Sequence, residues 1–251
     1  MVFERVCVES FLYHAVLMTL FDSSLDCLSS ILGRLNLDQY LSDPVHPENA
    51  TPGSPASTQP ILDASYKFYL LIVDVVWLAR TSFSPKSIDY ATWLRLRITF
   101  ARWEGAIGDG RSEETDNHIG KLYTIGIRML LVQANPSLLV NDVVNSLELL
   151  FQRGLAIIRR LDVQDVFVYY YLWPLVVVGS IAISPADRKM IEDKVCQVSG
   201  SPQEGSVALA SHRLKTAWTQ GTMCESRSLR ILIQLQTILV GNSVLPSEIR
   251  L

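Results

Sequence analysis

Residues 166–183 carry no charge and predict a helix that is buried on every side. It reads VFVYYYLWPLVVVGSIAI, and a run of this length is either a membrane span or the centre of a helical core. In a membrane its three consecutive tyrosines would face lipid without hydrogen-bond partners. Pro174 should kink or break the helix, and Ser184-Pro185 begins a new one. These features favour a buried central helix over a membrane span.

Helical periodicity recurs along most of the remaining chain. Apolar residues return every three or four positions, and no segment alternates apolar and polar residues as a strand does. The segment 42–60 contains five prolines and few large apolar residues, which predicts a flexible loop within one domain. We therefore predict an all-α fold: a single helical domain over residues 1–251, packed around a buried central helix at about 166–183.

Composition narrows the possible partners and compartments. A net charge of −3 and the absence of a basic cluster argue against direct nucleic-acid binding by this chain. The four cysteines form no CxxC pair or Cys/His cluster, so neither a zinc site nor a disulfide framework is expected. Acidic residues near the N-terminus argue against a signal peptide. We expect an intracellular protein; its oligomeric state stays open.

The candidate chemistry is that of an aromatic pocket. The sequence contains no nucleophile motif GxSxG, no zinc-binding motif HExxH and no glycine-rich dinucleotide-binding motif. We therefore expect no metal and no other cofactor. Aromatic side chains on the apolar helices could line a small-molecule pocket, although simple core packing is the commoner role for any one of them. Tyr69 could donate a hydrogen bond to a ligand carbonyl or carboxylate, and Arg128 could pair with an acid; these are the candidate catalytic residues. The candidate substrate contacts are Tyr66, Trp77, Tyr123, Tyr170 and Trp173.

Three segments resemble a known family. PILDASYKFYLLIVDVVWLAR (60–80), LYTIGIRMLL (122–131) and LWPLVVVGSIAISPADRKMI (172–191) resemble segments of the fungal-specific transcription factor domain. The third is the most specific and is similar to the pattern (L/F)WPLFIAGCEAxxPEDRxxI. The segment 216–234 resembles the end of that domain more weakly. The resemblance implies the helical regulatory region of zinc binuclear-cluster regulators.

The sequence departs from that family pattern at several positions. The family domain normally follows a six-cysteine zinc cluster, which this sequence lacks. Ser180-Ile181 stand where the family has Cys-Glu, Ala186 replaces an acidic residue, and Asp63 replaces a glycine. We therefore expect no DNA binding by the family's usual route.

Three functional hypotheses follow. In the first, a stand-alone protein of fungal secondary metabolism binds an apolar metabolite and acts in the cytoplasm as a cofactor-free cyclase or isomerase, for example a pericyclic, Diels–Alderase-like enzyme. Such catalysis needs shape, desolvation and a few hydrogen bonds. In the second, the chain is the ligand-sensing domain of a zinc-cluster regulator in the nucleus. In the third, it is a remnant without activity. Fold alone does not decide between them, and the first is favoured narrowly.

Overall fold

The computed structural model describes residues 2–35, 66–82, 90–108, 118–161, 168–198 and 205–240. Within these ranges every regular element is helical, which confirms the predicted all-α class. The predicted proline-rich loop at 42–60 lies outside the described residues. The α-helices are α1 (Val2–Thr19), α2 (Leu28–Leu32), α4 (Tyr66–Thr81), α5 (Tyr90–Gly108), α6 (His118–Gln133), α7 (Val140–Ile158), α8 (Leu172–Ser180), α9 (Pro185–Gln197), α10 (Gly205–Thr222) and α11 (Arg227–Val240). Two short 3-10 helices are η1 (Ser23–Cys27) and η4 (Val168–Tyr171).

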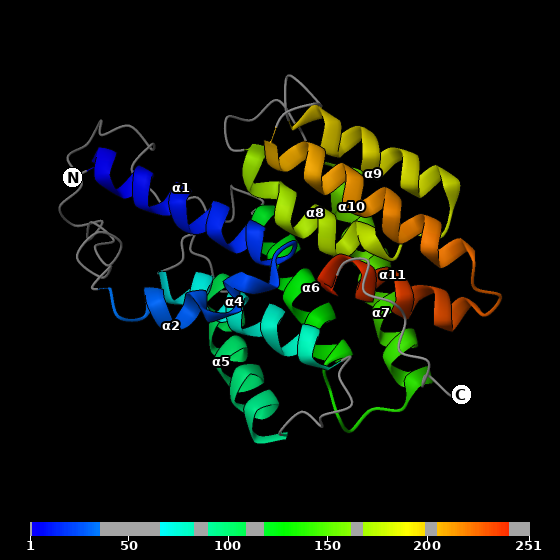
Figure 1. Ribbon diagram of the computed structural model, residues 1–251, viewed down its shortest axis with the longest axis horizontal. Helices are drawn as coiled ribbons and strands as arrows, with labels where there is room; N and C mark the ends of the chain where they lie inside the picture. Colours follow the sequence, from blue (N-terminus) through cyan, green and yellow to red (C-terminus); the bar gives the residue numbers. More distant parts are fainter. Residues whose placement is uncertain are drawn as a thin grey trace.

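Helix α8 lies in the middle of the fold (Figure 1). All nine of its residues are buried, and none of them carries a charge. It contacts α1, α6, α7, α9, α10 and α11. The expectation of a buried central helix is therefore correct, and the apolar run is explained by helices that cover it from several sides.

The bounds of that helix differ from the prediction. Residues 168–171 form the 3-10 helix η4, and the α-helix extends only from Leu172 to Ser180. Pro174 is the third residue of α8 and lies in its first turn, where a backbone N–H has no acceptor within the helix, so the proline is accommodated there without kinking α8. Helix α9 starts as expected, with Ser184 at the N-cap and Pro185 at its first position, although the Ser184 side chain makes no capping hydrogen bond.

Glycines allow close approach between helices, as Gly126 and Gly179 illustrate. A Cβ atom on Gly126 would lie 2.8 Å from Cζ3 of Trp173, so the bare glycine lets α6 pack against the indole of α8. A Cβ atom on Gly179 would lie 2.7 Å from Cγ2 of Ile191 and would separate α8 from α9. Both distances are shorter than real carbon contacts, so the packing around α8 has no space for a methyl group.

Arg80 connects α4 to both ends of the described chain. Its guanidinium is buried; Nε donates to the carbonyl oxygen of Leu239 over 2.6 Å, Nη1 pairs with the carboxylate of Asp26, and Nη2 donates to the carbonyl oxygen of Thr19. The guanidinium fork thus satisfies acceptors of α1, η1 and α11 together, which a lysine cannot do.

Two large apolar side chains face solvent although the helical periodicity of their segments predicts that they face inward. Phe11 is 58% exposed on α1, and Trp77 is 39% exposed on α4. Their neighbours Leu12 and Val76 are fully buried, so each helix is rotated slightly from the face that the pattern predicted. Across the described ranges, none of the helices combines the length and hydrophobicity that a membrane crossing requires.

Candidate functional site

Four tyrosines from four separate elements meet in the core. Tyr13 comes from α1, Tyr69 from α4, Tyr123 from α6 and Tyr170 from η4, and all four are buried. The ring centroids of Tyr13 and Tyr170 are 4.5 Å apart. We call these four residues the tyrosine cluster. Their phenols bring hydrogen-bonding groups into a region that is otherwise apolar.

A buried carboxylate adjoins the cluster. Glu9 of α1 is only 4% exposed, and the Tyr69 hydroxyl donates to its Oε1 over 3.3 Å. Burial, and then the negative charge of Glu9, raise the pKa of Tyr170 to about 12. Burial is also the main reason that the pKa values of Tyr69 and Tyr123 lie well above the ordinary tyrosine value. At neutral pH these phenols are therefore protonated and uncharged.

Tyr123 and Trp173 form a stacked pair beside Glu9 and the other phenols. Their ring centroids are 5.2 Å apart and their planes differ by 4°. Neither the Tyr123 hydroxyl nor the Trp173 Nε1 has a hydrogen-bond partner within the described part of the chain, although both atoms are buried. A buried polar group without a partner is costly, so these two atoms mark an unusual place in the core.

The structure brings together four of the seven predicted site residues. Tyr69, Tyr123, Tyr170 and Trp173 meet around Glu9 and Tyr13, two residues that sequence reasoning missed. A signal for Glu9 was present, because a carboxylate four positions before Tyr13 falls on the same helical face. Whether these residues contact a ligand stays a prediction.

The other predicted site residues lie elsewhere. Trp77 is partly exposed to solvent and does not belong to the cluster. Arg128 is five residues after Tyr123, about 140° around the helix, and its Nε pairs with Oε1 of Glu104 over 2.6 Å. The expected acidic partner of Arg128 is thus a residue of the protein on α5. The Tyr66 side chain lies outside the described part of the structure.

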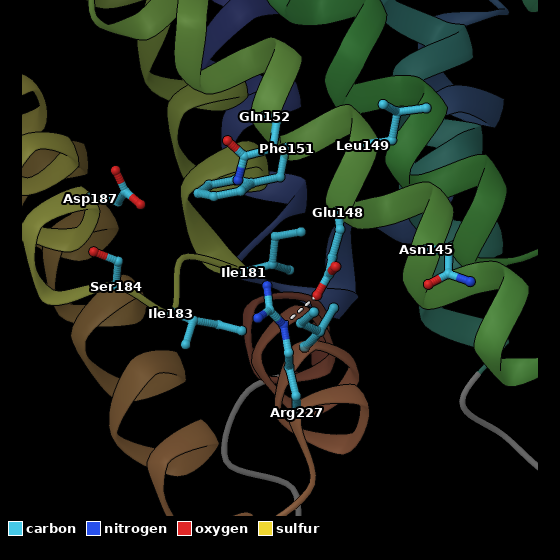
Figure 2. Close-up of a pocket in the computed structure, with 11 residues that line it drawn as sticks. Asn145, Glu148, Leu149, Phe151, Gln152, Ile181, Ile183, Ser184, Asp187 and Arg227 are labelled. Atoms are coloured by element: carbon cyan, nitrogen blue, oxygen red, sulfur yellow. Dashed lines mark hydrogen bonds and ion pairs between the residues drawn. The ribbon is translucent and has the colours of Figure 1, made fainter.

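A cavity of about 470 Å³ lies apart from the tyrosine cluster, between α7, the turn into α9 and the start of α11 (Figure 2). We call it the α7–α11 cavity. Apolar side chains from all three elements contribute to its wall. Its lining residues are Asn145, Glu148, Leu149, Phe151, Gln152, Ile181, Ile183, Ser184, Asp187, Arg227 and Ile231.

Two charged side chains form an ion pair in the wall of this cavity. Nε of Arg227, on the first residue of α11, lies 2.6 Å from Oε1 of Glu148 on α7 (Figure 2). The Arg227 side chain is 69% exposed and that of Glu148 33% exposed. Only Nε of the guanidinium is used in this pair, so its two Nη groups remain available as donors to a ligand oxygen.

Further polar groups lie at the entrance to α9. Asp187 lines the α7–α11 cavity and pairs with Nη2 of Arg159 over 3.1 Å. Ser184 presents a hydroxyl that is not used for capping. The cavity therefore combines an apolar wall with a small number of polar groups, as small-molecule sites do.

Neither a metal site among the described residues nor a relative of known function adds to this picture. Within the described ranges, no group of three or more His, Cys, Asp or Glu side chains is placed to hold a metal ion. The chain matches no described protein family, no curated protein and no solved structure. The fungal transcription factor resemblance consequently stays a prediction.

Proposed function

We propose that this chain binds an apolar small molecule in the α7–α11 cavity and converts it, without a cofactor, by isomerisation or cyclisation. The observation that carries the proposal is the cavity itself. Its volume of about 470 Å³ lies within the range of roughly 300–1,000 Å³ that is typical of small-molecule sites. Phe151, Ile181 and Ile231 supply apolar contacts, and one ion pair supplies polarity.

The ion pair suggests the type of reaction. The Glu148 carboxylate can accept a proton from a carbon beside a ligand carbonyl, and Arg227 can donate hydrogen bonds to the oxygen on which negative charge develops. Return of the same proton from Glu148 to a different carbon completes an isomerisation. No electron is gained or lost, so no redox partner is needed.

Ligand binding would also strengthen this pair. Arg227 is largely exposed, and water weakens the interaction of its charge with any other group. An apolar ligand seated against Phe151 and Ile231 would displace that water and lower the local dielectric constant. The same ligand would hold its reacting carbons in one geometry, which by itself can contribute several kcal/mol to lowering the barrier.

The test is a comparison of metabolites. The purified protein is incubated with a metabolite extract of its source organism, and products are compared by mass spectrometry with those of heat-denatured protein. We expect a product of unchanged mass that forms with native protein and is lost with Glu148→Gln or Arg227→Met. Glu225→Gln is the matched control, because Glu225 is exposed and does not line the cavity.

The other outcomes distinguish the alternatives. A compound that the wild type retains but does not convert, and that Arg227→Met no longer retains, would support the cavity as a binding site. It would contradict the catalytic part of the proposal and favour the ligand-sensing hypothesis. Binding that falls with Tyr69→Phe but not with Glu148→Gln would move the site to the tyrosine cluster. If no compound is retained or converted, the proposal is wrong.

A further inference from the structure

Two arginines lie where the turn that leads into α9 meets α11. Arg188 of α9 donates from Nε to the carbonyl oxygen of Ala182 over 2.8 Å, and Gln234 of α11 reaches the same oxygen over 3.4 Å. Arg230, one turn before Gln234, donates from Nη2 to the carbonyl oxygen of Cys224 over 3.0 Å. Each guanidinium is therefore held by one backbone carbonyl oxygen: that of Ala182, just before α9, and that of Cys224, between α10 and α11.

Each guanidinium also has a buried donor that is not used. Nη2 of Arg188 and Nε of Arg230 are buried and have no hydrogen-bond partner within the described part of the chain. No carboxylate of the described residues forms an ion pair with either arginine: the nearby Asp187 pairs with Arg159, and Glu192 pairs with Lys215. Burial, and then the positive charge of Arg230, lower the pKa of Arg188.

Two neighbouring cations with unused donors are unfavourable unless an anion joins them. Like charges at short distance repel, and each buried unpaired donor carries a desolvation cost. An oxyanion placed between them would remove both costs, because its oxygens can accept from two guanidinium groups at once. The first turn of α11, on which Arg230 lies, adds partial positive charge.

We infer that Arg188 and Arg230 form a binding site for an oxyanion, a phosphate or carboxylate group. The site shares no residue with the α7–α11 cavity, so it is independent of the proposed function. Trp218 forms the floor of this site: the guanidinium carbon of Arg188 lies 5.7 Å from the centre of its ring. The Trp218 Nε1 donates to the carbonyl oxygen of Gly179 over 3.0 Å, which fixes the indole beneath the arginine.

Titration with inorganic phosphate tests the site. Ionic strength is held constant by replacing sodium chloride with phosphate, and tryptophan fluorescence and the midpoint of thermal unfolding are recorded. We expect a saturable fluorescence change, because phosphate alters the position of the Arg188 cation over Trp218. We also expect phosphate to raise the unfolding midpoint, because it binds the folded state and not the unfolded one.

Variants assign the effect to the two arginines. Arg230→Gln and Arg188→Gln should each weaken phosphate binding roughly tenfold or more, since each removes a charge-assisted hydrogen bond. Arg188→Lys keeps the charge but loses the planar fork, and should weaken binding while remaining folded. Arg153→Gln, on the exposed face of α7, is the matched control and should bind as the wild type does.

Acetate, titrated in the same way, identifies the kind of oxyanion. Tighter binding of phosphate than of acetate would indicate a phosphorylated ligand, and the reverse a carboxylate ligand; either supports the inference. Absence of saturable binding of both anions would overturn it. So would binding that is unchanged in Arg230→Gln and Arg188→Lys.

Discussion

Replacing Tyr123 by phenylalanine should leave the protein at least as stable as the wild type. The substitution removes only the hydroxyl, which is buried and has no partner within the described part of the chain. The ring keeps its stacking on Trp173 at 5.2 Å. An unpartnered buried polar group costs roughly 1–3 kcal/mol, and its removal should raise the free energy of unfolding by about 1 kcal/mol.

Tyr69→Phe is the matched comparison, because it removes the same atom from a hydroxyl that does have a partner. Tyr69 donates to Glu9, and the carboxylate of Glu9 is almost fully buried. Loss of that donor leaves the buried carboxyl group of Glu9 with fewer hydrogen bonds, which should lower the free energy of unfolding by about 2 kcal/mol. The two variants, identical in chemistry, should thus differ by about 3 kcal/mol in free energy of unfolding.

The assay is urea-induced unfolding at pH 7, followed by far-ultraviolet circular dichroism. The dependence of the free energy on urea must be the same in the wild type and both variants, so that the midpoints report stability. A Tyr123→Phe protein destabilised by more than about 1 kcal/mol would refute the reasoning, because its hydroxyl would then contribute a favourable hydrogen bond.

Three further predictions concern packing, the Arg80 contacts and pH. Gly126→Ala should destabilise the fold by about 1–3 kcal/mol in thermal unfolding, because the added methyl would lie 2.8 Å from the Trp173 ring; an unchanged midpoint would mean that α6 and α8 separate easily. Arg80→Met should lower the free energy of unfolding in urea by about 3 kcal/mol, since it leaves Asp26 and two carbonyl oxygens without their donor. Arg80→Lys should recover only part of that free energy. Stability should also fall above about pH 10, where the unfolded chain loses phenol protons that the tyrosine cluster retains; below that pH the contribution is fully present. The loss approaches about 1.4 kcal/mol per pH unit for each such tyrosine, and Tyr170→Phe should make the pH dependence of the urea midpoint shallower; an identical slope would contradict the assignment.

Periodicity predicted the helices because the residues of a buried helix face are apolar and recur every three or four positions in the sequence. The clearest case is α7, in which Val143, Leu147 and Ile158 are buried as the pattern indicates. Helix starts were visible where proline and a capping residue coincide, as at Ser184-Pro185. These are local features, and a single segment contains the information that determines them.

Rotation of a helix within the fold was harder to predict. Trp77 is apolar and lies in an almost wholly apolar segment, so the pattern contains little to say which side of α4 faces solvent. The same problem affected the 166–183 run, where uniform hydrophobicity concealed the change from 3-10 to α-helix at Leu172. Periodicity loses its power wherever every position is apolar.

The candidate sites depend on contacts between distant segments. Glu148 and Arg227 are separated by 79 positions, and Arg188 and Arg230 lie on different helices. Nothing in the local pattern of α7 indicates that its charged edge meets the start of α11. The tyrosine cluster was partly predictable because its members are unusual in apolar helices, whereas the α7–α11 cavity consists of residues that are ordinary one by one.

The central position of α8 also determines which backbone groups exchange with solvent last. Six helices cover it, and all of its side chains are buried, so its amides can contact deuterated solvent only when several of those helices detach together. Its amide hydrogens should therefore exchange through global unfolding, whereas those at the exposed start of α11 exchange through local opening. The slowest exchange rates in this protein would then measure the cooperativity of the entire helical core.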